Sequence, residues 1–277
     1  MPNFKTSDNL TLHYTDTGKG LPILCLAGLT RNSGDFDYID GLLGDVRLIK
    51  MDYRGRGRSD WATDHSSYSI PRESLDALEL MDHLGIARFA IIGSSRGGLC
   101  AMALGATQMD RLLGVALNDI GPELAAAALE DIKNFVGQPP IWQNLDSAAS
   151  ARAEIMQGFA NVPDGRWREE CAKIFVQTDA GLINAYDPKL RDAVLEASLQ
   201  PIPDLWPFFN AFAACPTALI RGANSPLLTQ ETFDKMQAAL PEAIAVNVPD
   251  RGHIPFLDEP AALDALRQWI DQIRLLT

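Results

Sequence analysis

One short stretch, residues 89–103, constrains the fold of this chain more than any other. It begins as an apolar run, passes through a turn of small residues and continues with helical spacing. The turn fits the pattern G-x-S-x-G, with Gly93, Ser95 and Gly97 in register. Small residues are needed around the serine because a sharp strand-to-helix turn leaves no room for larger side chains. The stretch therefore predicts that Ser95 Oγ is a nucleophile at the tip of a sheet, beside a helix N-terminus that favours a developing oxyanion.

Composition narrows the function classes. The 277-residue chain has 36 Asp and Glu against 24 Lys and Arg, and its net charge of -12 disfavours nucleic acid or an anionic membrane as a partner. The first residues form no apolar targeting segment, and no apolar run reaches the ~18 residues of a membrane span. The four cysteines are scattered, and the four histidines lack metal-ligand spacing. We therefore expect a cytoplasmic protein with no metal, no cofactor, and no nucleic-acid or membrane partner.

Strand and helix patterns alternate along most of the chain, as in a mostly parallel sheet whose strands are connected by helices. The alternation stops after Pro122 and resumes near Thr217, and the stretch between is irregular and helical. We predict an α/β fold with a core of residues 1–122 and 215–277. Residues 123–214 are expected to form an inserted helical cap over a site at the C-terminal edge of the sheet. Besides the strand that opens residues 89–103, expected strands span residues 10–15, 22–28, 47–52, 112–119, 217–220 and 245–248, and expected helices include 36–43, 71–84 and 260–275.

A turn rich in glycine and arginine, residues 52–59, follows one of these strands. Its glycines could suggest a phosphate-binding loop, but no helix begins at the turn and no Lys-Ser or Lys-Thr pair follows it. The pattern favours a structural turn held by pairing of its arginines with carboxylates.

A base and two backbone donors are expected beside the serine. His253 follows the last expected strand at the same sheet edge as Ser95, and a nucleophilic serine needs a base within hydrogen-bond reach. An oxyanion hole needs two convergent N–H groups. We predict that they belong to Arg96, directly after the nucleophile, and to Leu29, in the loop after the strand of residues 22–28.

Four motifs in this order resemble the α/β-hydrolase superfamily, in its branch with a helical cap; they are residues 27–29, 52–59, 93–98 and 252–260. The resemblance implies Ser95 as nucleophile and His253 as general base. The chain departs from the family in two places. Ala27-Gly28 stands where the family often has His-Gly, and Ser225 stands where it most often has the acidic residue that orients the base.

We predict that Asp119 supplies the missing acid. It ends the strand that follows the helix after Ser95, and adjacent strands lie only ~4.8 Å apart, so its carboxylate can reach the same imidazole. Ser225 carries no charge and cannot stabilise an imidazolium. Two alternatives remain open at this point: Asp119 only caps the loop before Pro122, or Asp250 is the acid.

The leading function is that of a serine hydrolase acting on a small carboxylic ester, lactone or related acyl substrate through an acyl-enzyme. Serine at the nucleophile position argues against the dehalogenases and epoxide hydrolases that share the resemblance, because those use Asp there. The alternatives are a C–C bond hydrolase of ring-fission products and a ligand receptor with little turnover.

For two side chains, the sequence leaves two interpretations open. The Arg96 guanidinium either recognises a substrate carboxylate or forms a buried salt bridge with Asp52 or another acid. Trp206, in the expected cap, either lines the substrate pocket or packs the cap onto the core.

Overall fold

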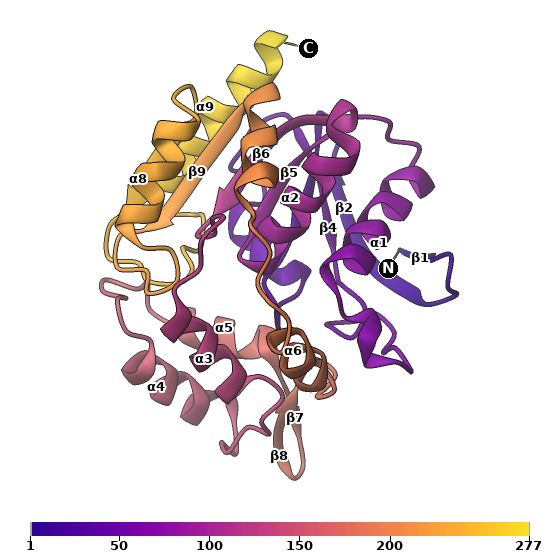
Figure 1. The fold of residues 1–277 in the computed structure, drawn as a ribbon. Helices are drawn as coiled ribbons and strands as arrows, with labels where there is room; N and C mark the ends of the chain where they lie inside the picture. Colours follow the sequence, from indigo (N-terminus) through magenta and orange to yellow (C-terminus); the bar gives the residue numbers. More distant parts are fainter. Residues whose placement is uncertain (1, 277) are drawn as a thin grey trace.

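The computed structural model describes residues 2–276, which form an eight-stranded central sheet with helices on both faces (Figure 1). The strand order is β1-β2-β4-β3-β5-β6-β9-β10. The first two strands pair antiparallel and the other six run parallel, which confirms the predicted α/β class. In chain order the strands are β1 (Asn3–Lys5), β2 (Thr11–Gly18), β3 (Leu21–Leu26), β4 (Val46–Met51), β5 (Phe89–Ser94), β6 (Leu112–Asn118), β9 (Thr217–Gly222) and β10 (Ile244–Val248).

Successive residues of each strand point to opposite faces of the sheet, so the apolar strands supply two separate cores. On β3, Leu24 and Leu26 pack under α1 (Ile70–His83), α2 (Arg96–Gln108) and α8 (Gln230–Ala239). Ile23 and Cys25 face the other side, where α9 (Pro260–Leu276) and the 3-10 helix of Ser33–Ile39 cover the sheet. A short helix was expected over residues 36–43; the 3-10 helix begins three residues earlier and ends at Ile39.

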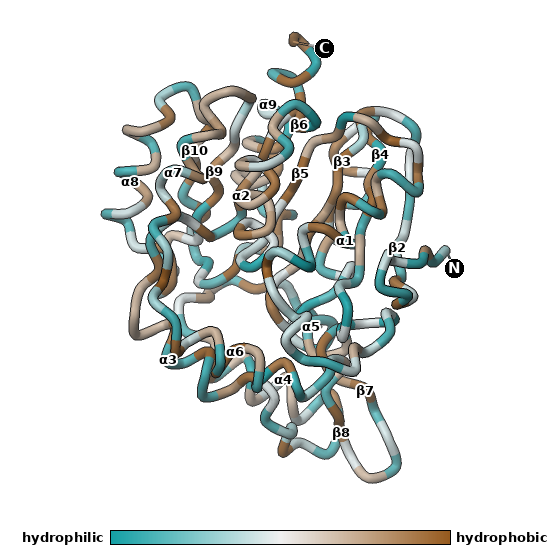
Figure 2. The backbone as a smooth tube through the Cα atoms, turned by 45° about the vertical axis from the view of Figure 1, so that its right-hand side comes forward, coloured by the Kyte–Doolittle hydropathy of each residue, from teal (hydrophilic) through white to brown (hydrophobic). Residues whose placement is uncertain are grey.

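The stretch between β6 and β9 leaves the sheet at its C-terminal edge and contains most of the irregular structure. We use the name inserted segment for residues 123–214. Figure 2 shows its helices α3 to α6 and its hairpin gathered together outside the sheet. Its elements are α3 (Ala126–Phe135), α4 (Leu145–Ile155), α5 (Arg166–Ile174), β7 (Phe175–Thr178), β8 (Gly181–Asn184), α6 (Leu190–Ser198), α7 (Trp206–Asn210) and the 3-10 helix of Ala211–Ala214.

One element of the inserted segment was not expected from the sequence. The β7–β8 hairpin was not expected, because four-residue strands are too short to give a clear alternating pattern. In addition, Phe209 and Phe212 are fully buried in the same core as α2, so the last turns of the segment belong structurally with the sheet and its helices. No helix within residues 2–276 combines the length and apolar character needed to cross a lipid bilayer.

Candidate active site

The turn between β5 and α2 holds Ser95 in a strained conformation, with φ of 50° and ψ of -116°. Such values are costly for a residue with a side chain and are concentrated at functional sites. The flanking glycines are required by close contacts. A Cβ added to Gly93 would lie 2.6 Å from the Gly97 carbonyl oxygen, and one added to Gly97 would lie 2.0 Å from the Leu26 carbonyl oxygen. These contacts explain why the pattern needs glycine at both positions.

Three side chains from three loops form a continuous hydrogen-bonded chain at this edge. His253 Nε2 lies 3.0 Å from Ser95 Oγ, and His253 Nδ1 lies 2.7 Å from Asp119 Oδ2. Asp119 follows β6 directly and is completely buried, whereas the His253 side chain is 25% exposed. A carboxylate accepts a hydrogen bond from Nδ1–H and thereby favours the tautomer whose Nε2 is free to accept the serine hydroxyl proton. The structure thus brings together the three residues singled out in the sequence.

The Asp119 carboxylate accepts two further hydrogen bonds. The Gly222 N–H donates to Oδ1 at 2.9 Å, and the Ser225 hydroxyl donates to Oδ2 at 2.6 Å. Ser225, which stands where the acid was expected from the resemblance, is therefore a hydrogen-bond donor to Asp119, the acid predicted from the sequence. Asp250 lies outside this arrangement, because its carboxylate accepts a hydrogen bond from Asn161 at the surface.

Two backbone N–H groups are available beside Ser95. Within residues 2–276, neither the Leu29 N–H nor the Arg96 N–H donates a hydrogen bond to a carbonyl oxygen of a turn or loop, or to a side chain. The Leu29 loop lies against the serine, since a Cβ added to Gly28 would be 3.8 Å from Ser95 Cβ. Arg96 is the first residue of α2, where backbone N–H groups have no acceptor within the helix. This arrangement suits a developing negative charge.

The Arg96 side chain points to a buried acid on α1. Arg96 Nε donates to Glu73 Oε2 at 2.5 Å, and Arg56 donates to Glu73 Oε1 at 2.6 Å. Arg56 also donates to the Leu29 carbonyl oxygen at 2.9 Å, so Glu73 connects the residues that carry both backbone donors. Burial raises the pKa of Glu73, but the charges of Arg56 and Arg96 outweigh it and hold the pKa below its ordinary value.

The turn of residues 52–59 is held by carboxylates, as its sequence predicted. Buried Arg54 pairs with Asp76 at 2.7 Å and with Asp8 at 2.8 Å. Asp52 does not pair with Arg96. Its carboxylate instead accepts hydrogen bonds from two backbone N–H groups, at 2.7 and 2.9 Å.

Sequence reasoning missed Glu73 and a second group of charged residues, Arg31 and Arg152, beside the Leu29 loop. Pairing between residues far apart in sequence, such as Arg31 with Glu170, leaves no local pattern. Trp206 is partly buried, donates its indole N–H to Glu123 at 2.8 Å and packs edge-on against Phe209. Its contribution to substrate binding stays a prediction.

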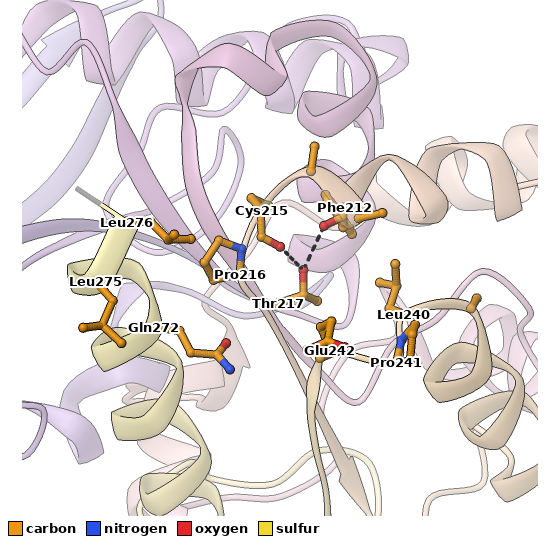
Figure 3. A pocket seen from close by; sticks show the side chains of 14 residues that line it. Phe212, Cys215, Pro216, Thr217, Leu240, Pro241, Glu242, Gln272, Leu275 and Leu276 are labelled. Atoms are coloured by element: carbon orange, nitrogen blue, oxygen red, sulfur yellow. Dashed lines mark hydrogen bonds between the residues drawn. The ribbon is translucent and has the colours of Figure 1, made fainter.

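A pocket of about 420 Å³ lies at the start of β9, at the end of the strand opposite to the Ser95 edge of the sheet (Figure 3). Thr217 lies in it and donates to the carbonyl oxygens of Phe212 and Cys215. We do not assign this pocket to the site. Among the residues that the structure describes, no three His, Cys, Asp or Glu side chains are grouped as metal ligands.

Comparison with known proteins identifies the family to which this chain belongs. Residues 23–266 match the model of the alpha/beta hydrolase family. The chain is 34% identical to 3-hydroxybutyrate-oligomer hydrolase of Cupriavidus necator over 89% of this chain and 87% of that protein. It is also 34% identical to haloalkane dehalogenase 2 of Mycobacterium tuberculosis, over 92% and 89%. A crystal structure of an alpha/beta hydrolase from Novosphingobium aromaticivorans superposes with a TM-score of 0.89 and 35% identity, over 98% and 97% of the two chains. The protein therefore belongs to the alpha/beta hydrolase family.

Proposed function

We propose that this hydrolase is a serine esterase that cleaves a small carboxylic ester, lactone or related acyl substrate. The observation that carries the proposal is the chain of hydrogen bonds from Ser95 through His253 to buried Asp119. Its distances lie within the range in which a base can remove a proton from a nucleophile.

In the first half of the reaction, Ser95 Oγ attacks the ester carbonyl carbon while His253 Nε2 takes the hydroxyl proton. The carbonyl oxygen becomes an oxyanion and accepts hydrogen bonds from the Leu29 and Arg96 N–H groups. The tetrahedral intermediate then expels the alcohol, which takes the proton from His253. The products of this half are the free alcohol and an acyl-Ser95 ester.

Water completes the cycle by the same route. His253 removes a proton from water as the water oxygen attacks the acyl carbon, and the second tetrahedral intermediate forms at the same two donors. Its collapse returns the proton to Ser95 Oγ and releases the carboxylic acid. Asp119 stays ionised throughout and stabilises the imidazolium in both halves.

The serine also distinguishes between the activities named among the relatives. Attack of Ser95 on a haloalkane carbon would form an alkyl ether, which a nearby base and water cannot cleave. Attack on an ester carbonyl forms an acyl ester, which water can cleave. We therefore favour the chemistry of the 3-hydroxybutyrate-oligomer hydrolase, whose name describes hydrolysis of a hydroxyacid ester, over that of the dehalogenase.

We further propose that the inserted segment is a cap over this site. Leu29 packs in one apolar cluster with Tyr186 and Leu190 of the segment, and Arg31 pairs with Glu170 of α5 at 2.5 Å. These contacts support a role in shaping the pocket and in excluding water.

Substitution of Ser95 tests the proposal. Wild-type protein is expected to hydrolyse p-nitrophenyl butyrate and to be labelled by a fluorophosphonate probe. Ser95→Ala should abolish labelling and reduce kcat by about 10⁶-fold, because the attacking oxygen is lost. The neighbouring Ser94→Ala is the control and should keep both activities, since the Ser94 hydroxyl is bonded to Asn118 inside the core.

Two outcomes contradict the proposal. Hydrolysis or labelling that survives in Ser95→Ala would assign the nucleophile elsewhere. Wild-type protein that is labelled but never turns over an ester would identify a ligand receptor.

A further inference from the structure

Arg31, two residues beyond the Leu29 donor, has a guanidinium of which only some N–H groups form hydrogen bonds. Its Nε and Nη2 donate to Asp35, and Nη2 also donates to Glu170 at 2.5 Å. Its Nη1 is buried and has no hydrogen-bond partner among the described residues. A buried donor without a partner costs free energy, so the position favours an acceptor that arrives with a ligand.

Arg152, on α4 of the inserted segment, lies near enough to Arg31 and Glu170 for their charges to act on it. Within residues 2–276 the Arg152 side chain makes no hydrogen bond or ion pair, and its Nε is buried without a partner. Its guanidinium carbon lies 5.9 Å from the centre of the Trp167 ring. Burial lowers the pKa of Arg152, and the positive charge of Arg31 lowers it further.

Among the described residues, no carboxylate pairs with Arg152. The carboxylates of Asp35 and Glu170 both accept hydrogen bonds from Arg31, and Glu170 also pairs with Lys173 at 3.4 Å. Two guanidinium groups held close together repel each other unless an anion lies between them. An anionic group of a ligand would relieve this repulsion.

Both arginines are connected to the loops of the active site. A Cβ added to Gly28 would lie 3.1 Å from Arg31 Cγ and 3.8 Å from Ser95 Cβ. On the other side, the Trp167 ring packs at 5.2 Å against Phe159. Phe159 in turn lies 3.0 Å from a Cβ added to Gly252, the residue before His253. The arginine pair thus lies between the loop of the oxyanion donor and the loop of the base.

We propose that Arg31 and Arg152 bind a carboxylate of the substrate, so that this enzyme prefers esters that carry a free carboxylate. Guanidinium groups match the planar geometry of a carboxylate and donate charge-assisted hydrogen bonds to it. The inference rests on the proposed esterase activity and deepens it. The Arg96 side chain does not have this role, because Glu73 and the Tyr68 carbonyl oxygen occupy it.

The test compares matched substrates that differ only in charge. One pair carries the group on the alcohol part, 3-(butanoyloxy)butanoate and its carboxamide. The other carries it on the acyl part, monoethyl succinate and ethyl succinamate. For wild-type enzyme we expect kcat/KM to be about 10–100-fold higher for the acid than for the amide in at least one pair, the range expected for hydrogen bonds to a charged group.

Arg152→Gln should reduce kcat/KM for the preferred acid by about 10–100-fold, mainly through KM, and change the amide less than about 3-fold. The control is Arg168→Gln on α5, whose exposed side chain pairs with Asp146 at 2.7 Å, and it should change neither. Arg152→Gln is also expected to raise the Tm, because it removes a half-buried charge whose Nε has no hydrogen-bond partner. Arg31→Gln is less useful, since it would also remove the ion-pair partner of the Asp35 carboxylate.

Three results would overturn the inference. Wild-type enzyme could show no preference for the acid in either pair, or Arg152→Gln could lower acid and amide equally. Arg152→Gln could also lower the Tm without changing the preference, which would mark a structural role. Hydrolysis of p-nitrophenyl butyrate separates these results from failure of the esterase proposal: activity on this neutral ester without acid preference contradicts only the inference, whereas no activity on any ester contradicts both.

Discussion

At the scale of single residues, backbone strain occurs at two residues whose side chains form the hydrogen-bonded chain of the site. Ser95 and Asp119 both have positive φ, 50° and 55° respectively. Residues other than glycine adopt such values at a cost of about 1–3 kcal/mol each and persist only where their surroundings fix them. For Asp119, the surroundings are the Gly222 N–H, the Ser225 hydroxyl and the His253 ring. The strain directs one carboxylate toward three donors.

The identity of the acid can be tested by moving it. Asp119→Asn should lower kcat for p-nitrophenyl butyrate by about 10³–10⁴-fold, because an amide favours the wrong imidazole tautomer and cannot stabilise an imidazolium. Ser225→Ala removes only one hydrogen bond to the carboxylate, and its expected cost is about 10-fold. Because Ser225 stands at the usual place of the acid, the double variant Asp119→Asn/Ser225→Asp should recover part of the lost activity.

Near wild-type activity in Asp119→Asn would show that the acid lies elsewhere. Circular dichroism of each variant is the control for folding. Ser225→Asp alone serves as a second control, since two adjacent buried carboxylates should repel each other and lower the Tm.

At the scale of elements, helix α1 organises the site without contributing to the hydrogen-bonded chain. Its Glu73 is fully buried and bonds to Arg56 and Arg96, which hold the Leu29 loop and the start of α2. Removal of one partner from a buried ionic group leaves the others uncompensated. Glu73 is therefore a positioning residue for both backbone donors.

Glu73→Gln should lower the free energy of unfolding by about 3–5 kcal/mol at pH 7, measured by urea denaturation. The matched control is Glu79→Gln on the same helix, whose carboxylate lies nearer the surface and pairs with Arg72, and it should cost less than about 1 kcal/mol. In the folded protein that remains, kcat should fall more than KM rises, because the donors act on the transition state.

The pH dependence of this stability loss has a defined sign. Because the folded pKa of Glu73 is below its ordinary value, its contribution to stability is fully present above the unfolded pKa of about 4.3. The contribution disappears as pH falls through the folded pKa. The stability difference between wild type and Glu73→Gln should thus be constant from about pH 6 to 8 and shrink below about pH 4.3. A difference that grows on acidification would contradict the assignment.

Comparison of these elements shows what the sequence can reveal. Ser95, His253 and Asp119 follow predicted strands, and parallel strands end at one edge, so local pattern, topology and the family resemblance together pointed to them. Glu73 and the arginine cluster were not predictable, because their partners lie in other elements and their burial depends on packing. The β7–β8 hairpin was missed for a similar reason: its strands are held by each other and by the neighbouring helices of the inserted segment.

At the scale of the whole molecule, the inserted segment is attached unevenly to the core. On one side it pairs with the turn after β4 through backbone hydrogen bonds, from Gly57 N–H to the Ala185 oxygen at 3.0 Å and from Asp187 N–H to the Gly55 oxygen at 2.8 Å. Tyr68 adds a hydrogen bond to the buried Asp187 carboxylate at 2.5 Å. In contrast, α3 contains no fully buried side chain. One side of the segment is therefore anchored through buried polar contacts, whereas α3 buries little of its surface.

Hydrogen–deuterium exchange can test this asymmetry. Local opening costs little free energy where few apolar contacts are buried. We expect amides of α3 to exchange at least about 10-fold faster than those of Gly57 and Asp187, and amides of β5 to be slowest.

Tyr68→Phe leaves the Asp187 carboxylate without its hydroxyl donor, so exchange should accelerate at residues 185–187. The Tyr68 carbonyl oxygen still accepts from Arg96, so α2 should exchange as in wild type and kcat should change little. In the wild-type protein, equal exchange in α3 and at residues 185–187, or slower exchange in α3, would show that the segment is not attached unevenly to the core.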